Sequence, residues 1–283
     1  MELLKSLWRI CMSDKPALVG GAVLVVYLMA ALFGPVFVHV GKVANPSLAY
    51  LTPSWRHPLG TDFLGQDVLS EVIVGTRPVI EVGLLAAVFA VFVGVVIGLA
   101  TGYLGGAIDM ALMRVADGFL TIPGLPLVIA VAAIIRSSSP FILAAIIAVT
   151  AWAGLARAVR SQALSLRTAD YIEAAKVQGL PLRNMISRQL LPNVGPYVAI
   201  NFLLTVTGAI YAEVGLFVLG VAPVSGTNWG IMINLAMGNG ALYTSKSVLY
   251  LLSPMAAIVF LQVALVFFAR ALDQLFNPRL RAQ

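Results

Sequence analysis

The sequence predicts an all-α polytopic membrane protein with six transmembrane helices. Of its 283 residues, 60% are hydrophobic and 11% are charged, and the mean hydropathy is +0.96. Such a chain has too little polar surface to cover a soluble globule. Six apolar runs approach the roughly 20 residues that cross a hydrocarbon core. They are Ala17–Val38, Val82–Leu104, Gly118–Ile135, Phe141–Ala156 (extending towards Leu164), Val194–Ala212 and Val248–Ala269.

The basic residues predict which side of the membrane each loop occupies. A net charge of +6 would suit nucleic acid, but its distribution indicates topology instead. If the amino terminus lies inside, 13 of the 18 Lys and Arg residues face the cytoplasm, as is typical of inner loops. We therefore expect a protein of the plasma or inner cell membrane, with both termini cytoplasmic and no nucleic-acid partner.

Residues 1–16 form a basic, partly amphipathic lead that we expect to lie along the inner surface of the lipid bilayer. The first apolar run follows Ser13-Asp14-Lys15-Pro16, a helix-start signal, and lacks a small-residue cleavage site. It should therefore remain as a first transmembrane helix, residues 17–40. The single cysteine, Cys11, excludes an internal disulfide and a cysteine metal cluster.

Residues 41–80 should form an extracytoplasmic segment, in which Asn45-Pro46, Thr52-Pro53 and His57-Pro58 indicate turns. A core transmembrane domain, residues 81–272, follows it. In the second span, Gly94, Gly98 and Gly102 recur every four residues, which favours close helix packing over a role with substrate.

The third span begins with three charged residues, Asp109, Arg114 and Asp117. Charges at membrane depth must face protein, water or each other. Arg114 and Asp117, three residues apart, either form an ion pair on one helix face or line a translocation path. Pro123 and Pro126 should kink or unwind the same helix.

The polar stretch 166–193 between the fourth and fifth spans predicts two short helices. Asp170 can cap the first helix, and Gly179 can end it in the left-handed conformation. Pro181 restarts a second helix, about Leu182 to Leu190, too short to be stable without a surface to lie against. Lipid headgroups or a protein partner would provide that surface. Its two faces hold Leu182, Met185, Ile186 and Leu190 on one side and Arg183, Asn184 and Arg188 on the other.

The same stretch resembles the EAA loop of ABC-importer permeases. Glu173-Ala174-Ala175, Gly179 and Leu191-Pro192 stand at that loop's spacing, and Gln189 replaces its more usual Ile or His. The resemblance implies a coupling element that docks on a cytoplasmic ATPase. Its residues here would be Glu173, Ala174, Ala175, Gly179, Arg183, Arg188, Leu191 and Pro192.

A second set of motifs resembles the second permease of the dipeptide/oligopeptide/nickel branch of that family. These motifs are an outer signature, His57, Gly60, Asp62 and Asp67, and a closing Asn277-Pro278-Arg279 in the cytoplasmic tail, residues 273–283. Gln66 and Glu71 stand where relatives usually have Arg. Oligosaccharides or nickel chelates therefore stay open as cargo beside di- and oligopeptides.

The resemblance implies a type I ABC importer (MetI-like) permease fold and transport by alternating access. The partners would be a homologous second permease, two ABC ATPases and an extracytoplasmic substrate-binding protein. ATP and Mg would bind to the ATPases, with no cofactor on this chain. Arg157 and Arg160 could contact the ATPase, although snorkelling membrane anchors are the default interpretation. For Glu213 in the fifth span, we favour a hydrogen-bonded structural carboxylate over a proton relay.

An enzyme lacks the residues it would need here. The chain has no phosphate-binding G-x-x-x-x-G-K-[ST] loop and no G-x-S-x-G turn, and His39 and His57 cannot form a zinc site by themselves. An ion-coupled secondary carrier remains an alternative, but such carriers typically show internal repeats, which this sequence lacks. An intramembrane protease or lipid enzyme would need an acid/base pair that no motif supplies.

Overall fold

The computed structural model describes residues 14–41, 44–241, 243 and 247–276, and almost all its regular structure is helical. The all-α prediction is confirmed. Cys11, most of the predicted lead and the Asn277-Pro278-Arg279 motif lie outside the described residues. Five helical segments are long and apolar enough to span a membrane singly. They are α2 (Lys15–Phe37), α3 (Val68–Leu104), α6 (Pro140–Leu166), Leu182–Val218 and α11 (Val248–Phe276).

A sixth span exists if α4 (Gly106–Thr121) and α5 (Gly124–Ile135) count as one broken span. The two helices meet at 88° across Ile122 and Pro123. Pro123 has no N–H to continue the hydrogen-bond ladder of α4, so the predicted interruption is confirmed.

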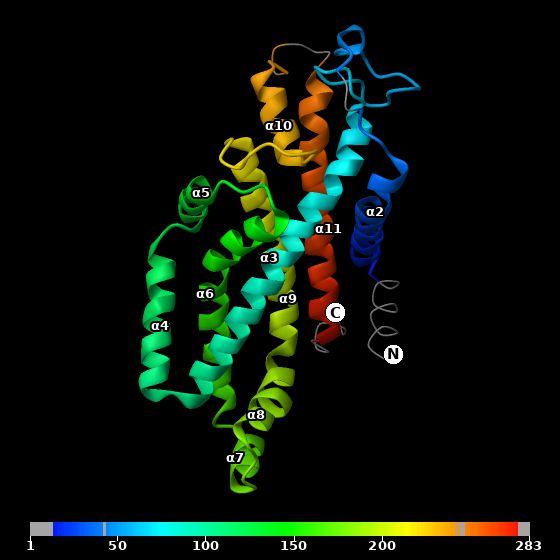
Figure 1. Ribbon diagram of the computed structural model, residues 1–283. Coiled ribbons are helices and arrows are strands. Elements are labelled where there is room, and N and C mark those ends of the chain that lie inside the picture. Colours follow the sequence, from blue (N-terminus) through cyan, green and yellow to red (C-terminus); the bar gives the residue numbers. More distant parts are fainter. Residues whose placement is uncertain (1–13, 42–43, 242, 244–246, 277–283) are drawn as a thin grey trace.

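Helix α3 crosses the centre of the bundle and packs on α6, α9 (Leu191–Val218) and α2 (Figure 1). Its glycine strip faces α6. A Cβ atom at Gly94, Gly98 or Gly102 would lie 3.0 Å from Trp152 O, 2.6 Å from Ala156 O and 2.5 Å from Ala163 Cβ, respectively. The predicted packing role of the strip is therefore confirmed, because the two helix backbones approach too closely for side chains.

Helix α3 begins fourteen residues before the predicted second span, at Val68 rather than Val82. Asp67 is the reason, since its carboxylate accepts a hydrogen bond from Ser70 N and so caps a helix start inside the segment predicted as turns. The first span begins and ends slightly earlier than predicted, since α2 runs from Lys15 to Phe37 rather than over residues 17–40.

The two ends of the bundle carry different structures (Figure 1). One end holds α7 (Asp170–Val177) and α8 (Leu182–Asn184), which project beyond the other helices. The opposite end holds α10 (Trp229–Gly238) and a long loop, residues 44–67. A 3₁₀ turn, η1 (Pro46–Leu48), lies in that loop.

Candidate coupling lobe and membrane groove

Residues 166–193, here called the α7–α8 lobe, fold as two short helices joined at Gly179. Gly179 has a φ of 70°, so the predicted left-handed helix end is confirmed. Gly179 N donates to Lys176 O at 3.0 Å and Leu180 N donates to Ala175 O at 3.2 Å, the bonds of a Schellman motif. The predicted cap is wrong. Ala169 holds the N-cap position and Asp170 lies inside the first turn, so its side chain makes no cap hydrogen bond.

The second half of the lobe is one continuous helix with the fifth span. Three residues of α8 lead into a π-helical turn, η2 (Met185–Leu190), and then directly into α9. Pro192 cannot donate a backbone hydrogen bond, which favours the widened turn before it. Asn193 Nδ2 donates to Gln189 O at 2.6 Å and satisfies one carbonyl there.

The apolar side of this second helix is covered by the chain itself. Met185 and Leu190 are fully buried in one cluster with Ile172 and Ala175 of α7. This covering leaves no continuous apolar face for lipid headgroups. Leu182 departs from the prediction and is 44% exposed, because it lies at the tip of the lobe beyond that cluster.

The exposed surface of the lobe combines apolar and basic side chains. Val177 is 89% exposed, and Tyr171 and Leu182 are also exposed. Lys176 Nζ donates to Arg167 O at 3.2 Å and lies 6.0 Å from the centre of the Tyr103 ring. Of the predicted coupling residues, Ala175 is buried and the other seven are exposed: Glu173, Ala174, Gly179, Arg183, Arg188, Leu191 and Pro192.

The charged residues of the third span pair with the fourth span and not with each other. Arg160 on α6 binds Asp109 on α4 through two N–H···O bonds, with Nη2 2.6 Å from Oδ2. Arg157 binds Asp117 in a second interhelical ion pair. Arg114 is exposed and forms no ion pair with any described residue. Of the two alternatives for Arg114 and Asp117, the ion pair is therefore wrong, and the translocation path stays a prediction. Arg157 and Arg160 connect two helices, which the anchor interpretation did not foresee.

Glu213 is a buried structural carboxylate. Its Oε1 accepts a hydrogen bond of 2.7 Å from Asn228 Nδ2, and Asn228 Oδ1 accepts from Gly230 N at the start of α10. The carboxylate thus connects α9 to the N-terminus of α10, and the predicted hydrogen-bonded role is confirmed.

The outer signature organises the start of α3. His57 Nδ1 lies 3.1 Å from Asp67 Oδ1, while Asp67 Oδ2 accepts from Ser70 N and Ser70 Oγ. Gly60 has a φ of 77°, and a Cβ atom there would lie 2.5 Å from Leu51 O. These residues hold the long loop against the end of the helix.

Asp62 is the fully buried member of that signature. Its Oδ1 accepts hydrogen bonds from Leu64 N at 2.9 Å and Gln66 N at 2.6 Å. Burial raises the pKa of the Asp62 carboxyl above its ordinary value, and the backbone hydrogen bonds from Gln66 and Leu64 oppose that rise. All four signature residues are thus engaged within the chain: His57, Asp62 and Asp67 through side-chain hydrogen bonds, and Gly60 through its left-handed turn.

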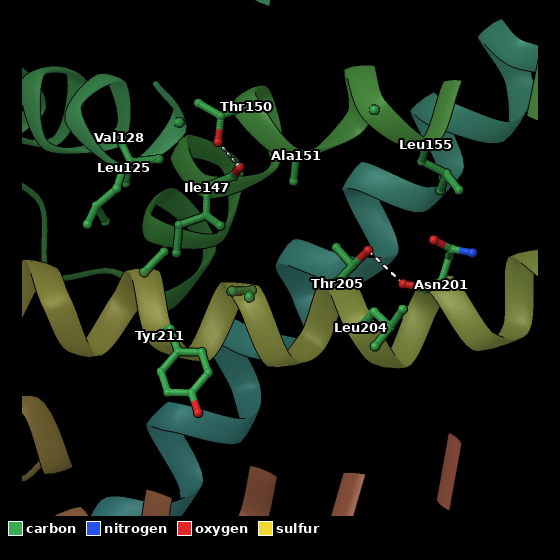
Figure 2. A pocket seen from close by; sticks show the side chains of 15 residues that line it. Leu125, Val128, Ile147, Thr150, Ala151, Leu155, Asn201, Leu204, Thr205 and Tyr211 are labelled. Atoms are coloured by element: carbon green, nitrogen blue, oxygen red, sulfur yellow. Dashed lines mark hydrogen bonds between the residues drawn. The ribbon is translucent and has the colours of Figure 1, made fainter. Parts of the chain in front are cut away.

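A cavity of about 610 Å³ opens between α5, α6 and α9, and we call it the membrane groove (Figure 2). Asn201 and Thr205 point from α9 towards α6 in Figure 2. None of the described residues that line the groove is charged. They are Gly124, Leu125, Val128, Ile147, Thr150, Ala151, Gly154, Leu155, Asn201, Leu204, Thr205, Gly208, Ala209, Tyr211 and Ala212.

The sequence contained a signal for this groove that hydropathy alone missed. Asn201, Thr205 and Gly208 recur at helical spacing within an apolar span, so they share one face of α9. Polar side chains on one face of a transmembrane helix favour protein or water over lipid as neighbours.

Comparison with known proteins finds matches that cover both the α7–α8 lobe and the membrane groove. Residues 94–282 match the family model described as "Binding-protein-dependent transport system inner membrane component". The dipeptide transport system permease protein DppC of Bacillus subtilis is 35% identical over 80% of this chain and 71% of its own length. The oligopeptide transport system permease protein OppC of the same organism is 33% identical over 80% and 76%. The probable D,D-dipeptide transport system permease protein DdpC of Escherichia coli is 31% identical over 97% and 91%.

Proposed function

The chain belongs to the family of binding-protein-dependent transport system inner membrane components, and on this premise we propose that it forms half of the translocation pathway of an ABC importer for di- and oligopeptides. The names of three relatives, all of them peptide transport permeases, support peptides as cargo. The resemblance of the sequence motifs supports the same assignment.

The remaining parts of the importer lie on other chains in this proposal. A homologous second permease forms the other half of the pathway, two ATPases bind ATP and Mg, and an extracytoplasmic binding protein delivers cargo. This chain is then a non-catalytic subunit of the cell membrane, with its α7–α8 lobe and both termini in the cytoplasm.

The observation that carries the proposal is the rigid connection between the lobe and the fifth span. Exposed Val177, Leu182 and Arg183 offer a partner an apolar surface with a basic edge. Met185 and Leu190 pack in one buried cluster with Ile172 and Ala175 of α7, so the two helices of the lobe are held together. Because the helix continues without a break from Leu182 to Val218, movement of the lobe by an ATPase displaces the span itself.

The test is reconstitution of the importer in proteoliposomes with its second permease, ATPases and binding protein. We expect ATP-dependent uptake of radiolabelled tri-alanine that requires the binding protein. Calorimetry on the binding protein identifies its ligands independently. Binding of oligosaccharides or nickel chelates without peptide affinity would overturn the peptide cargo alone, whereas uptake driven by an ion gradient without ATP would overturn the importer assignment.

A further inference from the structure

The membrane groove lies near the middle of two spanning helices. Thr150 and Gly154 are close to the midpoint of α6, and Asn201 is close to the midpoint of Leu182–Val218. Its volume of about 610 Å³ lies within the usual range of small-molecule sites. A space of this size halfway along two spans is at membrane depth.

The break between α4 and α5 adjoins the groove. Gly124 and Leu125, the first residues after the break, form part of its wall. Non-helical backbone at membrane depth is tolerated only where protein buries it or where it lines a water-filled cavity. Ile122 is 47% exposed, so the described chain does not bury the break.

Three polar side chains of the groove each donate one hydrogen bond to a backbone carbonyl of their own helix and keep acceptors free. Thr150 Oγ1 donates to Ile147 O, Thr205 Oγ1 donates to Asn201 O, and Asn201 Nδ2 donates to Tyr197 O. No described donor reaches Asn201 Oδ1. An amide oxygen has two lone pairs and each hydroxyl oxygen also accepts, so the groove offers acceptors to a ligand that brings N–H donors.

We propose that the membrane groove binds the main chain of a peptide in transit, with Asn201 Oδ1, Thr205 Oγ1 and Thr150 Oγ1 accepting from peptide N–H groups. This inference rests on the proposed import of peptides. Lipid tails have no donors to offer, and the N–H groups of a packed partner helix are used within that helix. Gly154 and Gly208 leave room beside the acceptors, and the uncharged wall does not select among cargo side chains, so any short peptide main chain fits.

Cysteine labelling of the assembled importer tests the proposal. In a Cys11→Ser background, Thr205→Cys and Thr150→Cys should react with a charged methanethiosulfonate reagent, and Phe92→Cys, on an exposed apolar face of α3, should not. Tri-alanine delivered by the binding protein with nucleotide should slow labelling at 205. Protection follows 1 + [L]/Kd, so about tenfold slowing is expected near ten times Kd.

A second experiment tests whether Asn201 accepts a hydrogen bond from the peptide, which reagent access to the groove alone does not show. Asn201→Leu, read through a cysteine at 205, should raise the tri-alanine concentration needed for half-maximal protection about fivefold, the effect of one lost hydrogen bond. Leu203→Met, a change on the same helix but outside the groove wall, should leave protection unchanged. Equal protection in both variants would overturn the assignment of Asn201.

If lipid or a second protein chain fills the groove instead, the labelling gives different results. Reaction of Thr205→Cys only with a lipophilic maleimide would show lipid in the groove, and no reaction with either reagent in any nucleotide state would show a second protein chain. Either result overturns the proposal while ATP-dependent uptake in the parent stands. Absence of that uptake would instead overturn the proposed function.

Discussion

Arg160 on α6 binds Asp109 on α4 through two N–H···O bonds, and this pair fixes the N-terminal end of α4 to the bundle. The second pair, Arg157 with Asp117, follows about two turns along α4. The two pairs differ in exposure. The Arg160 and Asp109 side chains are 30% and 15% exposed, and the Arg157 and Asp117 side chains are 54% and 52% exposed.

We predict that the Asp109–Arg160 pair contributes more stability than the Asp117–Arg157 pair. Exposed ion pairs contribute about 0–1 kcal/mol, and a bidentate, less exposed pair should exceed that. The measurement is a double-mutant cycle with Asp109→Asn and Arg160→Gln, followed by unfolding of the purified protein in detergent. Asp117→Asn with Arg157→Gln is the matched cycle, and an equal or larger coupling energy there would contradict the prediction.

Replacing Gly179 should uncouple transport from ATP hydrolysis. For a residue other than glycine, the left-handed backbone conformation costs about 1–2 kcal/mol, and a β-branched side chain raises that cost. Gly179→Val should therefore lose cargo-stimulated ATP hydrolysis, while Gly179→Asn, which tolerates this conformation, should keep much of it. Nothing lies within 4 Å of an added Cβ atom, so a clash would not explain the loss. Equal activity of the two variants would disprove the role of the turn.

Removing the Glu173 side chain should affect coupling and leave stability unchanged. Glu173 is exposed and its carboxylate forms no hydrogen bond or ion pair within the described chain. Surface substitutions of this kind change stability by less than about 0.5 kcal/mol. We expect Glu173→Ala to lower stimulated hydrolysis at an unchanged melting temperature, with Ser161→Ala, exposed on α6 outside the lobe, as control. Unchanged cargo-stimulated ATP hydrolysis in Glu173→Ala would show that this residue is not part of the proposed ATPase contact.

Topology can be checked by labelling whole cells. In a Cys11→Ser background, Thr227→Cys lies beside α10 and should react with a membrane-impermeant maleimide. Arg183→Cys, at the opposite end of the bundle, should react only after the cells are opened. The reverse pattern would place the α7–α8 lobe outside and contradict both the charge distribution and the proposed ATPase contact.

A methyl group in the glycine strip should destabilise the bundle. A Cβ atom at Gly98 would lie 2.6 Å from Ala156 O and 2.7 Å from Val159 Cβ, so α3 and α6 would have to separate. Overpacking of this kind costs about 1–3 kcal/mol. Gly98→Ala should therefore unfold at a lower detergent concentration than Gly21→Ala, because nothing lies within 4 Å of a Cβ atom at Gly21. Similar unfolding of both variants would refute the close packing of α3 on α6.

Local patterns predicted much of the fold because the bilayer imposes simple rules. The length of the apolar runs predicted the spans. Gly179 predicted the left-handed end of α7, and Pro123 predicted the break between α4 and α5, each from the chemistry of one short stretch. The start of α3 was missed because it depends on Asp67 capping a helix within an otherwise turn-rich segment. Such a cap competes with neighbouring turn signals that look equally strong in the sequence.

The site was harder to predict because its key relationships join distant helices. Arg160 and Asp109 are separated by 51 residues, whereas spacing within one helix suggested only a pair of Arg114 with Asp117. The groove wall likewise combines Thr150 with Asn201, which only the packing of α6 on α9 brings together. Local spacing cannot supply such pairings.

If an ATPase moves the α7–α8 lobe as proposed, the unbroken helix from Leu182 to Val218 would act as a lever arm. Its 37 residues correspond to a length of about 55 Å. If the arm pivots at the lobe, a tilt of about 5° displaces its far end by about 5 Å, one helical pitch. That far end carries Glu213, whose bond to Asn228 joins it to α10. In the proposed importer, a small tilt of the lobe would therefore displace α10 at the opposite end of the bundle, and the π-helical turn at Met185–Leu190 would lie near the pivot.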